Sequence, residues 1–62
     1  MIKISTLVHQ EFYLNCELFE KIEANPDTVI TMTNGNKYVV EESPLEILEK
    51  IKEFKRDVLG RF

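Results

Sequence analysis

The spacing of apolar residues changes once along the chain, from every second position to a helical spacing. Up to residue 42, hydrophobic and polar side chains alternate, as they do in a sheet with one buried face. After Ser43-Pro44 the apolar residues recur at intervals of three and four, which is typical of an amphipathic helix. This pattern predicts an α+β fold: a small antiparallel β-meander of four to five strands, with the option of curling into a half-barrel, followed by one C-terminal helix. We expect a single domain over residues 1–62, with the antiparallel sheet in 1–42 and the helix in 43–60.

Three strands are expected in the first part of the chain. Residues 2–5 and 11–15 alternate between apolar and polar side chains, which indicates two short strands of a first hairpin. The polar segment that begins at Asn15 is typical of a turn, and a third strand is expected at residues 19–24. The segment Asn25-Pro26-Asp27-Thr28 then matches a type I turn with proline at its second position.

The clearest local signal is a second hairpin around Asn34-Gly35. Arms rich in β-branched and aromatic residues, 28–33 and 36–41, flank this pair. Asn-Gly is typical of a two-residue type I′ turn, in which both central residues have positive φ angles. Such a turn would place Ile30 opposite Val39 and Val29 opposite Val40.

Under this register both faces of the second hairpin are partly apolar. One face carries Ile30, Met32 and Val39, and the other carries Val29, Tyr38 and Val40. A single helix can cover only one face of a sheet. The other face then requires either a sheet that curls on itself or a second copy of the chain.

The start of the helix carries strong signals. Ser43 fits the N-cap, Pro44 the first helical position, and Glu46 completes an S-x-x-E capping box. The helix is expected to run from Pro44 to Leu59, with Gly60 as the residue that ends it. Its apolar stripe consists of Pro44, Ile47, Ile51, Phe54 and Val58, and Leu48 widens it.

Composition adds a reason to expect self-association. The 62 residues contain a single cysteine, so no internal disulfide can form. A core in a chain this short seldom contributes more than about 3–5 kcal/mol, and oligomerisation is one remaining way to add stability. The chain contains no apolar run long enough to cross a membrane and no secretory signal at residues 1–5, so we expect a cytoplasmic location.

Few residues could carry chemistry. His9 and Cys16 are the only histidine and cysteine, and no third orienting group accompanies them. Structural zinc requires about four such ligands. The acids Glu41, Glu42 and Glu46 are explained by the helix dipole. We therefore expect no enzyme, with no catalytic, metal or cofactor-binding residues and no cofactor.

Two classes of binding function remain. Charge is uneven, because residues 1–49 hold three lysines against nine acids, whereas residues 50–62 hold five bases against two acids. The acidic strands disfavour nucleic acid as a partner. The alternative is a small-barrel RNA-binding regulator, which would stack bases on Phe12, Tyr13 and Tyr38 beside Lys37. The preferred function is protein contact, with a self-association or partner face made of Tyr13, Val29, Tyr38 and Val40.

The residues also resemble a known family. The run from Ile22 to Val40, I-E-x-x-P-D-T-x-I-x-x-x-N-G-x-K-x-V-V, and the segments Met1-Ile2-Lys3-Ile4 and Glu11-Phe12-Tyr13-Leu14-Asn15 are similar to the FlbD/SwrD family of small bacterial flagellar proteins. The turn residues that match the family pattern have a sufficient structural role; they are Asn25, Pro26, Asp27, Thr28, Asn34 and Gly35. The first hairpin departs from the pattern, because Thr6, Val8 and His9 stand where Arg, Asn and Gly are expected.

The resemblance implies a non-enzymatic role in swarming and swimming motility, without catalytic or cofactor residues. It implies protein partners in the flagellar motor, the stator or the basal body. The protein would then be cytoplasmic and peripheral at the flagellar base, and we expect it to form a homo-oligomer.

Overall fold

The computed structural model describes the backbone of residues 1–59 and the side chains up to residue 57. Over this range the elements are β1 (Ile2–Ser5), β2 (Glu11–Leu14), the short 3-10 helix η1 (Cys16–Leu18), β3 (Phe19–Ala24), β4 (Thr28–Met32), β5 (Lys37–Val40) and α1 (Pro44–Leu59). The strand expected at 19–24, the turn after Asn15 and the start of the helix at Pro44 are confirmed. Gly60, predicted to end the helix, lies outside the described residues.

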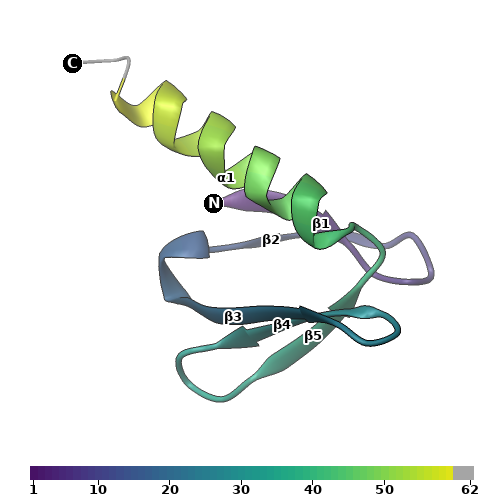
Figure 1. The fold of residues 1–62 in the computed structure, drawn as a ribbon. Helices are drawn as coiled ribbons and strands as arrows, with labels where there is room; N and C mark the ends of the chain where they lie inside the picture. Colours follow the sequence, from purple (N-terminus) through teal and green to yellow (C-terminus); the bar gives the residue numbers. More distant parts are fainter. Residues whose placement is uncertain (60–62) are drawn as a thin grey trace.

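The strands form two antiparallel sheets, as Figure 1 shows. The first pairs β1 with β2, and the second has the order β3-β4-β5. A single bridge between Thr6 and Val40 connects β1 to β5, so the sheets do not close into a barrel. The α+β prediction is confirmed. The helix α1 packs against β1 of the first sheet and β3 of the second.

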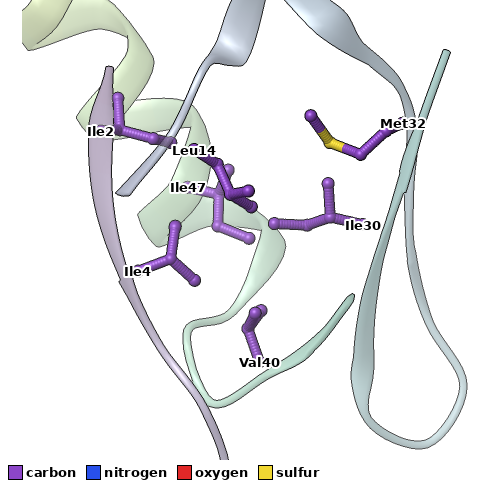
Figure 2. Close-up of a cluster of buried hydrophobic side chains, with 7 residues drawn as sticks. All are labelled: Ile2, Ile4, Leu14, Ile30, Met32, Val40 and Ile47. Atoms are coloured by element: carbon purple, nitrogen blue, oxygen red, sulfur yellow. The ribbon is translucent and has the colours of Figure 1, made fainter. Parts of the chain in front are cut away.

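The core lies between the two sheets and the helix. Its buried side chains, drawn in Figure 2, are Ile2, Ile4, Leu14, Ile30, Met32, Val40 and Ile47. They come from β1, β2, β4, β5 and α1, so every one of these elements contributes to a shared interior. Burial of this kind supplies most of the favourable free energy of folding.

The predicted register of the second hairpin is wrong by one residue. The structure pairs Ile30 with Tyr38 and Thr28 with Val40. The carbonyl of Met32 accepts from the Gly35 N–H at 2.9 Å, and the Met32 N–H donates to Asn36 O at 2.8 Å. Gly35 has φ of 92°, and Asn34 has no positive φ. This is a three-residue loop with a type I turn followed by a left-handed glycine, not the type I′ turn.

A shift of one residue moves side chains to the opposite face of a strand. Val40, predicted to share the self-association or partner face with Val29, points into the core and is only 1% exposed. Val39, predicted to lie beside Ile30, is 44% exposed on the outer face. The two predicted faces of this hairpin are therefore wrong in composition.

The turn between β3 and β4 is where we expected it but differs in type. The Asn25–Pro26 peptide is cis, which a type I turn does not contain. The Asn25 N–H donates to Asp27 O at 3.1 Å, and Ala24 pairs with Thr28 on either side of the loop. The predicted type I turn is therefore wrong, whereas its position is right.

The first hairpin uses the same turn as the second. The His9 N–H donates to Thr6 O and the Thr6 N–H donates to Gln10 O, both at 2.9 Å. His9 has φ of 64° and so occupies the left-handed position that Gly35 occupies in the other hairpin. The Thr6 hydroxyl also accepts from the Gln10 N–H at 3.1 Å. Tight turning is thus achieved here without glycine.

This geometry gives a prediction about position 9. A residue with a side chain is destabilised by about 1–2 kcal/mol when its φ is positive. Glycine avoids this strain, but its more flexible unfolded state offsets part of the stabilisation. The His9→Gly variant should unfold with a free energy about 1 kcal/mol higher than His9→Ala in urea titrations. Both variants remove the contact of His9 Nδ1 with Glu41 Oε2 at 2.7 Å, so their difference isolates the backbone. Equal stabilities would contradict the left-handed assignment.

The junction of the two sheets is held by residues that follow β5. The Glu41 N–H donates to Ser5 O at 3.0 Å. The buried carboxylate of Glu42 accepts the Ser5 N–H with both oxygens, each at 3.0 Å. Together with the Thr6 bridge, these bonds fix the end of β1 against the chain that leads into the helix.

The capping box at the start of α1 is confirmed. The Glu46 N–H donates to Ser43 Oγ at 3.2 Å, and the Ser43 N–H donates to Glu46 Oε1 at 3.1 Å. Within the apolar stripe Ile47 is buried, and Ile51 and Phe54 pack against the core. The side chain of Val58 lies outside the described part of the chain.

Candidate protein-interaction surface

The four residues predicted to form a self-association face do not share one surface. Tyr13 is 64% exposed on β2, and Val29 is half-buried on the outer face of β4. Tyr38 points inward and packs on Phe12, with ring centroids 5.7 Å apart. Val40 belongs to the core.

The aromatic residues of the alternative RNA-binding function are also separated. Tyr13 follows Phe12 on β2, so the two side chains point to opposite faces. Lys37 pairs with Thr31, on the face opposite to Tyr38. A hollow of about 270 Å³ adjoins Phe12 and Tyr38. The structure brings Phe12 and Tyr38 together but places Tyr13 and Lys37 elsewhere.

The side chains considered for chemistry each have a separate position. His9 lies before β2 and Cys16 lies after it, and the strand alone spans roughly 13 Å at 3.3 Å per residue. Glu41 contacts His9, while Glu42 and Glu46 accept backbone N–H groups. Within residues 1–59 no three His, Cys, Asp or Glu side chains are grouped as metal ligands would be.

An apolar groove lies between β3 and α1. It has a volume of about 340 Å³ and is lined by Phe19, Glu20, Lys21 and Ile22 of β3 and by Pro44, Leu48 and Ile51 of α1. We call these residues the β3–α1 groove. Leu48, one of the lining residues, is 49% exposed, and Leu45, which lies one turn earlier on the helix and does not line the groove, is 69% exposed. An apolar groove at the surface is a candidate site for protein interaction.

Charged residues flank the groove on both sides. On β3, Glu20, Lys21 and Glu23 are exposed, and Lys21 Nζ lies 3.6 Å from Glu23 Oε1. On α1, exposed Lys52 and Lys55 follow Leu45 and Leu48 at spacings of three and four, so these four residues occupy one side of the helix. An apolar centre with a charged margin is the usual composition of a protein interface.

The β3–α1 groove was missed at the level of sequence. Leu48 was interpreted as a residue that widens the core stripe, and the exposed position of Leu45 received no role. The available signal was that two leucines lie beside the stripe rather than in it. The position of β3 relative to α1 is needed to see that the side of the helix that carries Leu48 is not fully buried.

No helix in residues 1–59 has the length and apolar character needed to span a bilayer. The described fold thus consists of two small antiparallel sheets and one helix, with an apolar groove between β3 and α1. These features define the class as a small α+β protein with an apolar surface groove.

Comparison with protein families places the chain more closely. The family model FlbD, described as flagellar and swarming motility proteins, matches residues 1–59. The chain therefore belongs to the FlbD family, and the resemblance found in its sequence is confirmed. Searches of curated proteins and of solved structures found no match.

Proposed function

We propose that this protein is a non-enzymatic accessory protein that supports flagellar swarming and swimming by binding other proteins. Family membership over residues 1–59 supports the process. The β3–α1 groove supports the mode of action, because its lining is largely apolar and its residue Leu48 stays half-exposed. The groove is the single observation that carries this proposal.

The proposed site of action is the cytoplasmic side of the flagellum. The partner would be a component of the motor, the stator or the basal body, with the protein attached peripherally at the flagellar base. Its contacting segment should be apolar at the centre, to match Phe19, Ile22 and Leu48, and should carry charge at its edges.

The Leu48→Glu variant tests this function. Leu48 is half-exposed, so the variant should remain folded, yet it places a charge in the apolar centre of the groove. We expect the swarming zone of cells that carry only this variant to shrink to that of a deletion strain. Normal swarming by Leu48→Glu at unchanged protein level would contradict the proposal.

Matched variants complete the experiment. Val8→Glu introduces the same charge at an exposed apolar residue in the first hairpin, away from the groove, and should swarm normally. His9→Ala and Cys16→Ala should also leave motility intact. Loss of motility through either of these two changes, in a folded protein, would contradict the non-enzymatic role.

A further inference from the structure

The free edge of β3 borders the β3–α1 groove. Four consecutive residues of β3, 19–22, line the groove, so the edge of the strand faces it, and not only one of its faces. Among residues 1–59, β3 pairs with β4 alone, so it is the outermost strand of its sheet. An edge strand presents unpaired N–H and C=O groups that can pair with another chain.

The register shows which backbone groups of β3 are free. Met32 exchanges hydrogen bonds with the β5 side, so in β4 the alternate residues Val29 and Thr31 bond toward β3. Their partners on β3 are Glu23 and Lys21. The N–H and C=O of Ile22, between them, therefore point toward the groove.

We propose that a second copy of this chain pairs with β3, antiparallel and about a two-fold axis at Ile22, and so joins the two three-stranded sheets into one. Each Ile22 would exchange both backbone hydrogen bonds with the Ile22 of the second copy. The pairing is isologous, because the same strand serves on both sides. It places the groove of each copy against that of the other.

The charges of β3 favour this partner and this register. With the axis at Ile22, Lys21 of each copy lies opposite Glu23 of the other, which gives two pairs of opposite charge on the outer face. An axis moved to Lys21 would place two lysines opposite each other, and an axis at Glu23 would oppose two glutamates. Like charges directly opposite are destabilising.

The apolar surface is consistent with the same arrangement. Ile22 lines the groove together with Leu48, and the two-fold axis brings both residues of each copy toward the joint. The half-exposed Leu48 would then lose contact with water, and the burial of apolar surface favours association. A chain of 62 residues gains stability from such burial.

Two features of β3 could instead protect the edge from pairing, namely its charged side chains and its bulge. The irregularity lies between Phe19 and Lys21, so the ladder from Lys21 to Ala24 is regular and available. The charges alternate in sign along the strand and do not repel a second copy in the register described.

Light scattering coupled to size exclusion on the full chain tests the proposal. We expect twice the chain mass of 7.3 kDa at micromolar concentration. Lys21→Glu and Glu23→Lys should each weaken the dimer at least tenfold, because each places like charges opposite each other. The combined variant Lys21→Glu/Glu23→Lys restores opposite charges and should recover the dimer. A monomer at all concentrations, or a dimer indifferent to the single changes, would overturn the proposal.

Disulfide formation locates the axis independently. In a Cys16→Ser background, Ile22→Cys should give a covalent dimer on oxidation, because residues opposite each other in a hydrogen-bonded pair have Cα atoms about 5.5 Å apart. Lys21→Cys should not, since its symmetry mate lies about 8 Å away along the diagonal. The reverse preference would overturn the axis at Ile22.

The inference deepens the proposed function, on which its role in motility rests, but the two can fail separately. A monomeric protein whose Leu48→Glu variant fails to swarm would reject the second copy and keep the function. If Lys21→Glu disrupts the dimer but leaves swarming unchanged, the strand pairing would stand, but it would have no role in motility.

Discussion

Replacing Val40 by glutamate should unfold the protein, whereas the same change at Val39 should leave it folded. Val40 is 1% exposed and lies in the core with Ile30, while Val39 is 44% exposed. A carboxylate in place of Val40 would lose its water without gaining a partner, at a cost of several kcal/mol. A domain of this size has only about 3–5 kcal/mol of core stability to lose. Far-UV circular dichroism and urea titration would measure both variants.

The pair of valines also tests the register of the second hairpin. The two residues are adjacent, identical in type and on the same strand. A difference in strand propensity therefore cannot explain a difference in stability between the two variants. If Val39→Glu unfolded the protein and Val40→Glu did not, the type I′ register would be correct and the observed pairing of Ile30 with Tyr38 would be wrong.

The second large effect is expected at Glu42, whose carboxylate holds the end of β1. Glu42→Ala leaves the Ser5 N–H without its acceptor in a partly buried position. Hydrogen bonds to a charged group contribute about 1.5–3 kcal/mol, so we expect a loss of about 2 kcal/mol in the free energy of unfolding. Equilibrium urea titration would measure this loss against the wild-type protein.

Two neighbours provide the controls for Glu42. Glu42→Gln keeps an acceptor oxygen near Ser5 and should retain about half of the lost stability. Glu41 is exposed, so Glu41→Ala should change the free energy by less than about 0.5 kcal/mol. A Glu42→Ala variant as stable as Glu41→Ala would show that the bonds to Ser5 do not support the junction.

The parts of the fold that could be predicted are those set by neighbouring residues. The capping box of Ser43 and Glu46 locates the start of the helix, because both of its bonds lie within four residues. The strand at 19–24 was bounded by two turn segments that each begin with asparagine. Such local hydrogen bonds and turns can be predicted from the sequence because they do not depend on contacts with distant residues.

The turn types could not be predicted in the same way. Asn34-Gly35 fits a type I′ turn, but it also fits a type I turn with glycine in the following left-handed position. The choice between them sets the register, and the register depends on whether Val39 or Val40 meets the core. At the first hairpin no glycine marks the left-handed position, so His9 gave no local signal of a tight turn.

The candidate surface was beyond reach for a related reason. Tyr38 and Val40 were assigned to the self-association or partner face through the register that proved wrong. Leu45 and Leu48 were recognisable as apolar, but their exposure depends on how far α1 covers β3, which involves residues more than twenty positions apart. Periodicity describes one element at a time and carries no information on that distance.

The bonds between Ser5 and Glu42 also bear on how fast the protein folds. They join residues 37 positions apart, and the Thr6 bridge to Val40 spans nearly as much chain. Each hairpin can form locally, but the two sheets unite only after this long loop has closed, and loop closure costs entropy before the contacts return it. Folding should therefore be slower than in a helical bundle of equal length, and we expect the contact of β1 with the segment that precedes α1 to limit its rate.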